Sequence, residues 1–181
     1  MSFLFWERIY RVIQYVERRG KMSKVMDFGC GGGVMLPILS PQAEAVLAVD
    51  IDLAPSQKMS KFIPLGGNVT FATSYAQIPP CSLDLILALD VLEHVDDLNV
   101  VLVELCSRLS PGGEIIVSAP SENFAYKIGR RLAGSEYSGD YHVRNIYHIR
   151  QSLRQFVDVR TVAALFAPIP FFIVLSGAVK R

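Results

Sequence analysis

The chain has 181 residues, of which 51% are hydrophobic, and its net charge is +1. This length suits a single domain with a substantial core, so we expect residues 1–181 to form one domain. The near-neutral charge excludes a strongly basic nucleic-acid-binding chain. The three cysteines, Cys30, Cys81 and Cys106, are an odd set without C-x-x-C spacing, which argues against a disulfide framework or a zinc site. We therefore expect a reducing compartment, the cytoplasm, because the N-terminus also lacks a secretory signal pattern.

The first expected element is an amphipathic helix over residues 3–19, ended by Gly20. Its apolar stripe consists of Phe5, Ile9, Val12, Ile13 and Val16. Such a helix packs against the core, and it can also flank a ligand cleft. The pattern alone favours simple packing.

A glycine-rich stretch follows a short apolar run, which is expected to be a buried strand that contains Asp27 near its end. Four glycines then occur within residues 29–33, where the backbone can bend sharply and admit a ligand closely. Val34 stands where the Gly-x-Gly-x-x-Gly fingerprint of nicotinamide binders needs a glycine, so an NAD-type oxidoreductase is the weaker alternative. A second apolar run ends in Asp50. In a strand-helix-strand unit that acid can accept hydrogen bonds from ribose hydroxyls.

Strands and helices continue to alternate through the middle of the chain. We expect a short helix over residues 55–63, a third strand over 68–73 and a fourth over 83–89. The fourth is apolar apart from Asp84, as in parallel strands covered on both faces. Asp96 or Asp97 can cap the next helix. This alternation predicts an α/β fold with a doubly wound, mostly parallel sheet.

The last third of the chain contains a fifth strand over residues 114–119, after a Pro-Gly-Gly turn. We expect residues 121–141 to form a lid with its apolar face inward, and a further amphipathic helix to begin near residue 146. Residues 161–179 are uncharged over nearly the length of a membrane-spanning helix. Two prolines and many β-branched residues instead favour two buried strands joined by a turn.

Four stretches resemble, in order and spacing, the motifs of class I S-adenosylmethionine (SAM)-dependent methyltransferases. They read VMDFGCGGG, AVDID, LDLILALDVLEHVDD and LSPGGEIIVSAPSEN. The third contains the vLEHv block of a broad group of small members. The resemblance implies a Rossmann-like, seven-stranded sheet with its last strand antiparallel, and SAM as the methyl donor.

The resemblance also implies the residues that contact SAM. The glycine-rich turn would hold the methionine part, Asp50 the ribose, and the end of the fourth strand the methyl group. The expected SAM contacts are Asp27, Gly29, Cys30, Gly31, Asp50, Ile51, Ser74, Tyr75, Leu89, Asp90 and Leu92. Ser74 stands where relatives often offer an acid to adenine, so this chain has a neutral group there.

Two histidines are candidate general bases, because histidine titrates near neutral pH. His142 lies in a stretch similar to the acceptor-side "dHvr" of the family. His94 belongs to the LEHV block, where a fold-supporting role is the alternative. Asp90, Glu93 and His94 are also similar to an E-x-x-E-H arrangement that binds a divalent metal in some relatives. Asp90 is one methylene shorter than glutamate, and we assign no metal.

We therefore expect methyl transfer to an oxygen or nitrogen of a small, hydrophobic acceptor. The alternative is a non-catalytic SAM-binding protein or scaffold that attaches weakly to membranes through residues 3–6 and the apolar tail. Nucleic acid is disfavoured as the acceptor, because no Asn-Pro-Pro-Tyr-like motif follows the fourth strand. No feature of the sequence specifies an oligomeric state.

Overall fold

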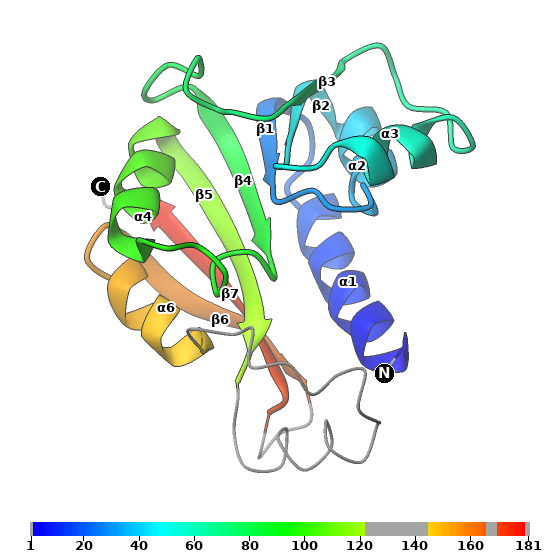
Figure 1. The fold of residues 1–181 in the computed structure, drawn as a ribbon. Coiled ribbons are helices and arrows are strands. Elements are labelled where there is room, and N and C mark those ends of the chain that lie inside the picture. The colour runs from blue at the N-terminus through cyan, green and yellow to red at the C-terminus, as the bar shows by residue number, and fades with distance from the viewer. Residues whose placement is uncertain (1, 122–144, 166–169, 180–181) are drawn as a thin grey trace.

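The computed structural model describes residues 2–121, 145–165 and 170–179. Within them, a seven-stranded sheet is covered by helices on both faces (Figure 1). The strand order is β3-β2-β1-β4-β5-β7-β6. Strand β7 runs antiparallel to both of its neighbours, β5 and β6, while β1 to β5 pair in parallel. The predicted doubly wound sheet with an antiparallel last strand is confirmed.

The elements alternate along the chain as expected. The strands are β1 (Met22–Phe28), β2 (Ala43–Val49), β3 (Val69–Ala72), β4 (Leu83–Leu89), β5 (Leu109–Pro120), β6 (Val157–Leu165) and β7 (Phe172–Val179). The helices are α1 (Ser2–Glu17), α2 (Leu36–Leu39), the 3-10 turn η1 (Ser40–Gln42), α3 (Ala54–Ser60), α4 (Leu98–Arg108) and α6 (Ile146–Leu153).

The central strands divide their side chains between two hydrophobic cores. On β4, Leu85 and Leu87 belong to the core that contains α1 and α2, whereas Ile86 and Ala88 belong to the core that contains α4 and α6. A strand that is buried on both faces is apolar at nearly all positions. In β4 only Asp84 departs from this rule, and its carboxylate accepts hydrogen bonds from the Ser23 and Lys24 N–H groups. The rule explains why the fourth strand could be predicted with the correct bounds.

Helix α1 packs through the predicted stripe, with Ile9, Val12 and Val16 buried. Its far end is fixed to the sheet by polar contacts with the buried carboxylate of Glu114 on β5. Tyr15 donates a hydrogen bond of 2.7 Å to that carboxylate, and Arg19 forms an ion pair with it. A buried charge is tolerated when it is paired in this way.

Three details differ from, or sharpen, the expectations. Strand β5 begins at Leu109 rather than at residue 114, with a register shift opposite Leu83 and Leu85 where the Pro-Gly-Gly sequence interrupts regular pairing. Strand β6 lies at the edge of the sheet and is only partly buried. Asp97 is the cap of α4, accepting hydrogen bonds from the N–H groups of Asn99 and Val100 at 3.0 and 3.1 Å.

Two expectations concern the predicted lid and the uncharged segment, which lie wholly or partly outside the described residues. The predicted lid lies outside the described residues apart from Ser121, as does His142. The uncharged segment contributes to two strands, β6 and β7, as predicted, and residues 166–169 between them lie outside the described residues. Among residues 2–121, 145–165 and 170–179, no helix combines the length and the hydrophobicity that crossing a bilayer requires.

Candidate functional site

A cavity of about 240 Å³ opens where β1 and β4 end at their carboxyl edge. Its walls come from α1, the end of β1, the glycine-rich turn and the end of β4. The lining residues are Phe5, Arg8, Ile9, Asp27, Gly29, Cys30, Gly31, Gly32, Val34, Met35, Leu89 and Asp90. This edge is where doubly wound sheets bind their ligands.

The glycine-rich turn is fastened to the neighbouring strand β2. The N–H groups of Gly29 and Cys30 both donate to the carbonyl oxygen of Val49, at 2.8 and 3.0 Å. Gly29 has φ +75°, and a Cβ there would lie 2.5 Å from a methyl group of Val91. Gly31 has φ +50°, and a Cβ at this position would have no neighbouring heavy atom within 4 Å. Gly29 therefore serves packing, whereas Gly31 keeps the cavity open.

Asp27 provides a buried carboxyl group beside this turn and is only 3% exposed. Burial, and secondarily the nearby charge of Asp50, raise the pKa of Asp27 to about 7. The group therefore titrates near neutral pH. A cation placed in the cavity would favour its ionised form.

Asp50 follows β2 and contacts the same turn. Its carboxylate accepts a hydrogen bond from the Gly31 N–H at 2.7 Å and another from the Asp52 N–H at 3.0 Å. These two bonds fix the orientation of the carboxylate. Carboxylate oxygens have further lone pairs, so Asp50 can still accept hydrogen bonds from a ligand.

On the opposite wall, the guanidinium group of Arg8 forms an ion pair with Asp90. The Arg8 side chain is buried, and its guanidinium carbon, Cζ, lies 5.3 Å from the ring centre of Phe5 and 4.6 Å from that of Phe172. Ser118 donates a second hydrogen bond to Asp90, at 3.0 Å. Burial raises the pKa of Asp90, and Arg8 offsets part of this effect. Helix α1 therefore contributes to the cavity, contrary to the favoured interpretation of simple packing.

The structure brings together six of the expected SAM contacts on the cavity wall: Asp27, Gly29, Cys30, Gly31, Leu89 and Asp90. Asp50 joins them through its hydrogen bond to Gly31.

The four other expected contacts lie elsewhere. Ile51 is 96% exposed and Leu92 is fully buried in the core under α4 and α6. Ser74 is exposed and accepts a hydrogen bond from the Ala76 N–H at 3.2 Å. Tyr75 packs edge-on against Phe28, with ring centres 5.4 Å apart. These four residues do not line the cavity in this structure.

The LEHV block does not assemble into a metal site. Glu93 is fully buried and His94 is exposed, while Asp90 is held by Arg8 and Ser118. Over the described ranges, no three His, Cys, Asp or Glu side chains are placed to hold a metal ion together.

Sequence reasoning missed the contributions of Arg8 and Ser118. One feature of the sequence could have indicated Arg8: it lies four residues before Val12, so a charged residue interrupts the buried face of an amphipathic helix. A buried arginine requires a paired acid, and only the tertiary structure identifies Asp90 as that acid. Ser118 carried no such signal within its apolar strand.

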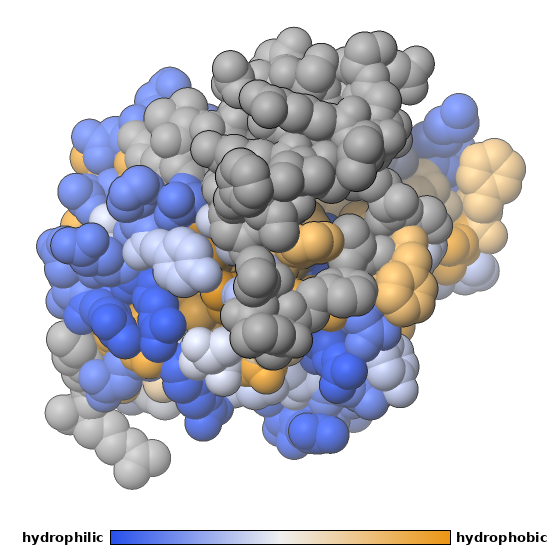
Figure 2. Space-filling view, turned by 90° about the horizontal axis from the view of Figure 1, so that it is seen from below, coloured by the Kyte–Doolittle hydropathy of each residue, from blue (hydrophilic) through white to orange (hydrophobic). Residues whose placement is uncertain are grey.

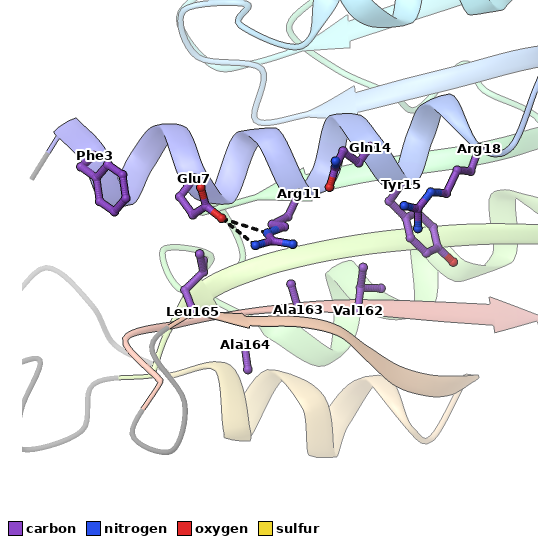
Figure 3. A pocket seen from close by; sticks show the side chains of 10 residues that line it. All are labelled: Phe3, Glu7, Arg11, Gln14, Tyr15, Arg18, Val162, Ala163, Ala164 and Leu165. Carbon is purple, nitrogen blue, oxygen red and sulfur yellow. Dashed lines mark hydrogen bonds and ion pairs between the residues drawn. The ribbon is translucent and has the colours of Figure 1, made fainter.

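A larger cavity, of about 550 Å³, lies on the other side of α1, between this helix and β6 (Figure 3). Its floor is made by small and aliphatic residues of β6, among them Ala163 and Ala164. The charged groups on its wall include Glu7 and Arg11, which are paired with each other at 2.8 Å. The smaller cavity combines the glycine-rich turn, an acid of raised pKa and the ligand edge of the sheet, and is therefore the candidate site.

Comparison with known proteins identifies the family. The family described as "Methyltransferase domain" matches residues 5–167, and the chain belongs to this family. A ubiquinone biosynthesis O-methyltransferase of Saccharophagus degradans is 31% identical over 132 residues, which cover 68% of this chain and 55% of that protein. A protein of the same name from Azotobacter vinelandii is 27% identical over 81% of this chain and 64% of its own length. The chain thus spans between half and two thirds of these relatives.

Solved structures share the fold at lower sequence identity. The N-methyltransferase NodS of Bradyrhizobium japonicum, solved with S-adenosyl-L-homocysteine, superposes with a TM-score of 0.71 over 97% of this chain and 88% of its own, at 16% identity. The magnesium protoporphyrin IX methyltransferase of Synechocystis gives a TM-score of 0.70 over 96% and 82%, at 20% identity.

Proposed function

We propose that this chain binds SAM in the cavity beside the glycine-rich turn and transfers its methyl group to an oxygen or nitrogen of a small, hydrophobic acceptor. The observation that carries the proposal is the meeting of Asp27, the Gly31 backbone and Asp50 at the ends of two neighbouring strands. Membership of a methyltransferase domain family favours this chemistry over the dinucleotide alternative.

The charges on the cavity wall suit the amino-acid end of SAM, which carries an ammonium and a carboxylate. Asp27 would pair with the ammonium, and Arg8 would contact the carboxylate. The Nε atom of Arg8 is buried and has no hydrogen-bond partner among the described residues, so one donor is available. Asp50, oriented by Gly31 and Asp52, would accept hydrogen bonds from the ribose hydroxyls.

When bound, SAM supplies a methyl group on an activated sulfonium. The protein must then hold the acceptor atom close to that carbon and in line with the bond that breaks, which can contribute up to about 7–11 kcal/mol. A base that removes the acceptor proton contributes roughly 10²–10⁴-fold. We propose His142 for this role, with His94 as the second candidate.

Calorimetry on the purified chain tests donor binding. We expect heat on titration with SAM and with S-adenosylhomocysteine, and we expect Asp50→Ala to weaken both by at least about tenfold, the loss of one charged hydrogen-bond partner. Asp52→Ala is the matched control, because this acid lies two residues on and accepts a hydrogen bond from the Ala54 N–H at 3.0 Å, at the start of α3. Unchanged affinity of Asp50→Ala would remove the ribose assignment.

A transfer assay tests the acceptor. The curated relatives are named O-methyltransferases of ubiquinone biosynthesis, which favours a hydroxyl over an amine as the acceptor of this chain. We therefore expect turnover with hydrophobic phenols to exceed turnover with amines of similar size. SAM binding without turnover on any acceptor of a broad panel would instead favour the non-catalytic scaffold.

A further inference from the structure

Strand β6 forms one edge of the seven-stranded sheet. It comes last in the strand order, and within residues 2–121, 145–165 and 170–179 it pairs with β7 alone. An edge strand offers a row of N–H and C=O groups that can bind another strand. At nine residues, β6 is longer than the other edge strand, β3, which has four. Of the two edges, β6 is therefore the better template for a partner.

Only one half of this edge is regular. Residues 157–161 pair one by one with β7, and the register then shifts between Thr161 and Ala163. Such a bulge bends a strand and interrupts regular pairing. A second strand can therefore extend the sheet along residues 157–161, a segment whose central residue is Val159.

The regular segment carries one acid and one base, placed symmetrically about its centre. Asp158 and Arg160 are exposed, and they lie on the same face of the sheet because side chains alternate along a strand. Arg160 forms an ion pair with Glu114, but Glu114 is also paired with Arg19. One carboxylate thus faces two guanidinium groups, and the cluster keeps a positive charge. The Arg160 side chain is 69% exposed, so this charge is accessible to a partner at the edge.

These charges match those of a second copy of the chain. When two β6 strands pair antiparallel with Val159 opposite Val159, Asp158 of each copy lies opposite Arg160 of the other. Opposite charges in such cross-strand positions attract, whereas like charges repel. Centring the pairing on Asp158 or on Arg160 instead places two like charges opposite each other. The charges therefore favour one partner, one orientation and one register.

We propose that two copies of the chain associate through their β6 edges about a twofold axis, joining the two sheets into one. Such an interface is isologous, since each copy contributes the same surface. The nine residues of β6, all of them described, expose no large hydrophobic side chain, in contrast to the side of the molecule where α1 begins (Figure 2). Backbone hydrogen bonds and charge therefore provide the affinity. Strands β5 and β7 separate this edge from β4 and the candidate cavity, so the association is independent of SAM binding.

Analytical ultracentrifugation of the intact chain tests the proposal. We expect a monomer–dimer equilibrium in which added salt weakens the dimer, because the opposite charges are screened. Asp158→Arg places arginines opposite each other and should raise the dissociation constant of the dimer at least about tenfold. Glu44→Arg is the matched control, since it makes the same change of charge at an exposed acid of β2, which lies inside the sheet.

Mixing two charge-reversal variants gives a sharper test. Asp158→Arg has two positive charges at the edge and Arg160→Asp has two negative ones, so each variant alone should dimerise weakly. Together they place opposite charges at both cross-strand positions, and an equimolar mixture should form a heterodimer. Thermal melts establish that each variant folds.

Cysteine cross-linking tests the register without changing a charge, and it decides the question if Arg160→Asp does not fold. In a Cys81→Ser background, which removes the exposed native thiol, oxidised Val159→Cys should form a disulfide-linked dimer. Directly opposite residues of antiparallel strands have Cα atoms about 4.5–5.5 Å apart, within the range of a disulfide. Thr161→Cys is the control, because Thr161 lies opposite Val157 and its two copies are too far apart to link.

Four results would overturn the proposal. The first is a chain that stays monomeric at every concentration, and the second is a dimer that Asp158→Arg weakens no more than Glu44→Arg does. The third is a mixture of folded charge-reversal variants that does not associate, and the fourth is cross-linking of Thr161→Cys but not of Val159→Cys. SAM affinity should be the same in Asp158→Arg as in the parent. An absence of SAM binding would contradict the proposed function and leave the dimer unaffected.

Discussion

Arg8 and Asp90 form an ion pair that ties the first helix to the end of β4 at the cavity. Asp90 has φ +52°, a backbone conformation that non-glycine residues adopt at a cost. The ion pair and the hydrogen bond from Ser118 hold the residue in this conformation. The cavity wall therefore depends on a contact between residues 82 positions apart in the sequence.

Removing one partner of this pair should harm both stability and binding. We expect Arg8→Ala to lower the free energy of unfolding by roughly 3–5 kcal/mol, because it leaves a partly buried carboxylate without its cation. Denaturant unfolding measures the change. The double variant Arg8→Ala/Asp90→Asn should be more stable than Arg8→Ala alone. If the losses of unfolding free energy in Arg8→Ala and Asp90→Asn simply add up in the double variant, the two residues are not coupled and the prediction is contradicted.

SAM affinity should depend on pH through Asp27. The ionised carboxylate is the form that pairs with an ammonium, and the pKa of Asp27 is raised to about 7. We expect affinity to fall about tenfold for each pH unit below 7 and to level off above it. Calorimetry between pH 5.5 and 8.5 measures this profile. In Asp27→Asn the affinity should be weak throughout and the slope should vanish.

The same group should make the ligand-free protein less stable at higher pH. The folded-state pKa, about 7, exceeds the ordinary value of 3.8, so the folded protein retains a proton that the unfolded chain has released. The free energy of unfolding is unaffected by this group below about pH 4. It falls by up to about 4 kcal/mol as the pH rises from there to about 7. Asp27→Asn should therefore melt at a higher temperature than the parent at pH 8, with little difference at pH 4. A lower melting temperature at pH 8 would contradict the burial cost.

Alanine substitutions at Gly29 and Gly31 should have different effects, the first on stability and the second on SAM binding. Gly29→Ala places a methyl group 2.5 Å from Val91, so we expect a marked drop in melting temperature. The Cβ of Gly31→Ala would have no other heavy atom within 4 Å, and the positive φ costs about 1–2 kcal/mol. We expect that variant to fold and to bind SAM at least about tenfold more weakly, because the added methyl enters the cavity. Similar melting temperatures for the two variants would refute the distinction.

His142→Ala should lower turnover by about 10²-fold or more while leaving SAM affinity nearly unchanged, as expected for a base that acts on the acceptor. The control is His148→Ala on α6, whose side chain lies away from the cavity lining. Steady-state rates and calorimetry together measure the two quantities. Parent-like rates in His142→Ala would transfer the assignment to His94.

Much of the fold followed from the sequence because its signals are local. The largely apolar run of β4 and the stripe of α1 each report burial by a rule that depends on neighbouring residues alone. The start of β5 was misjudged, since Pro111 and Gly112 signal a turn even where a shifted register lets the strand begin earlier.

The site was only partly predictable, because its walls come from distant segments. Asp27 and Asp50 could be found from their positions at strand ends. Ile51, Ser74, Tyr75 and Leu92 were placed by family pattern, which cannot report the direction of each side chain in this chain. Arg8 could not be paired with Asp90 without knowing that α1 crosses the carboxyl edge of the sheet.

The close approach of Val91 to Gly29 couples two stretches that are usually considered separately. One belongs to the turn proposed to hold the donor, and the other begins the LEHV block toward the acceptor side. A branched residue at position 91 commits position 29 to glycine on grounds of space, in addition to the positive φ of Gly29. An engineer who enlarges position 29 must therefore both reduce position 91 and relieve that backbone conformation.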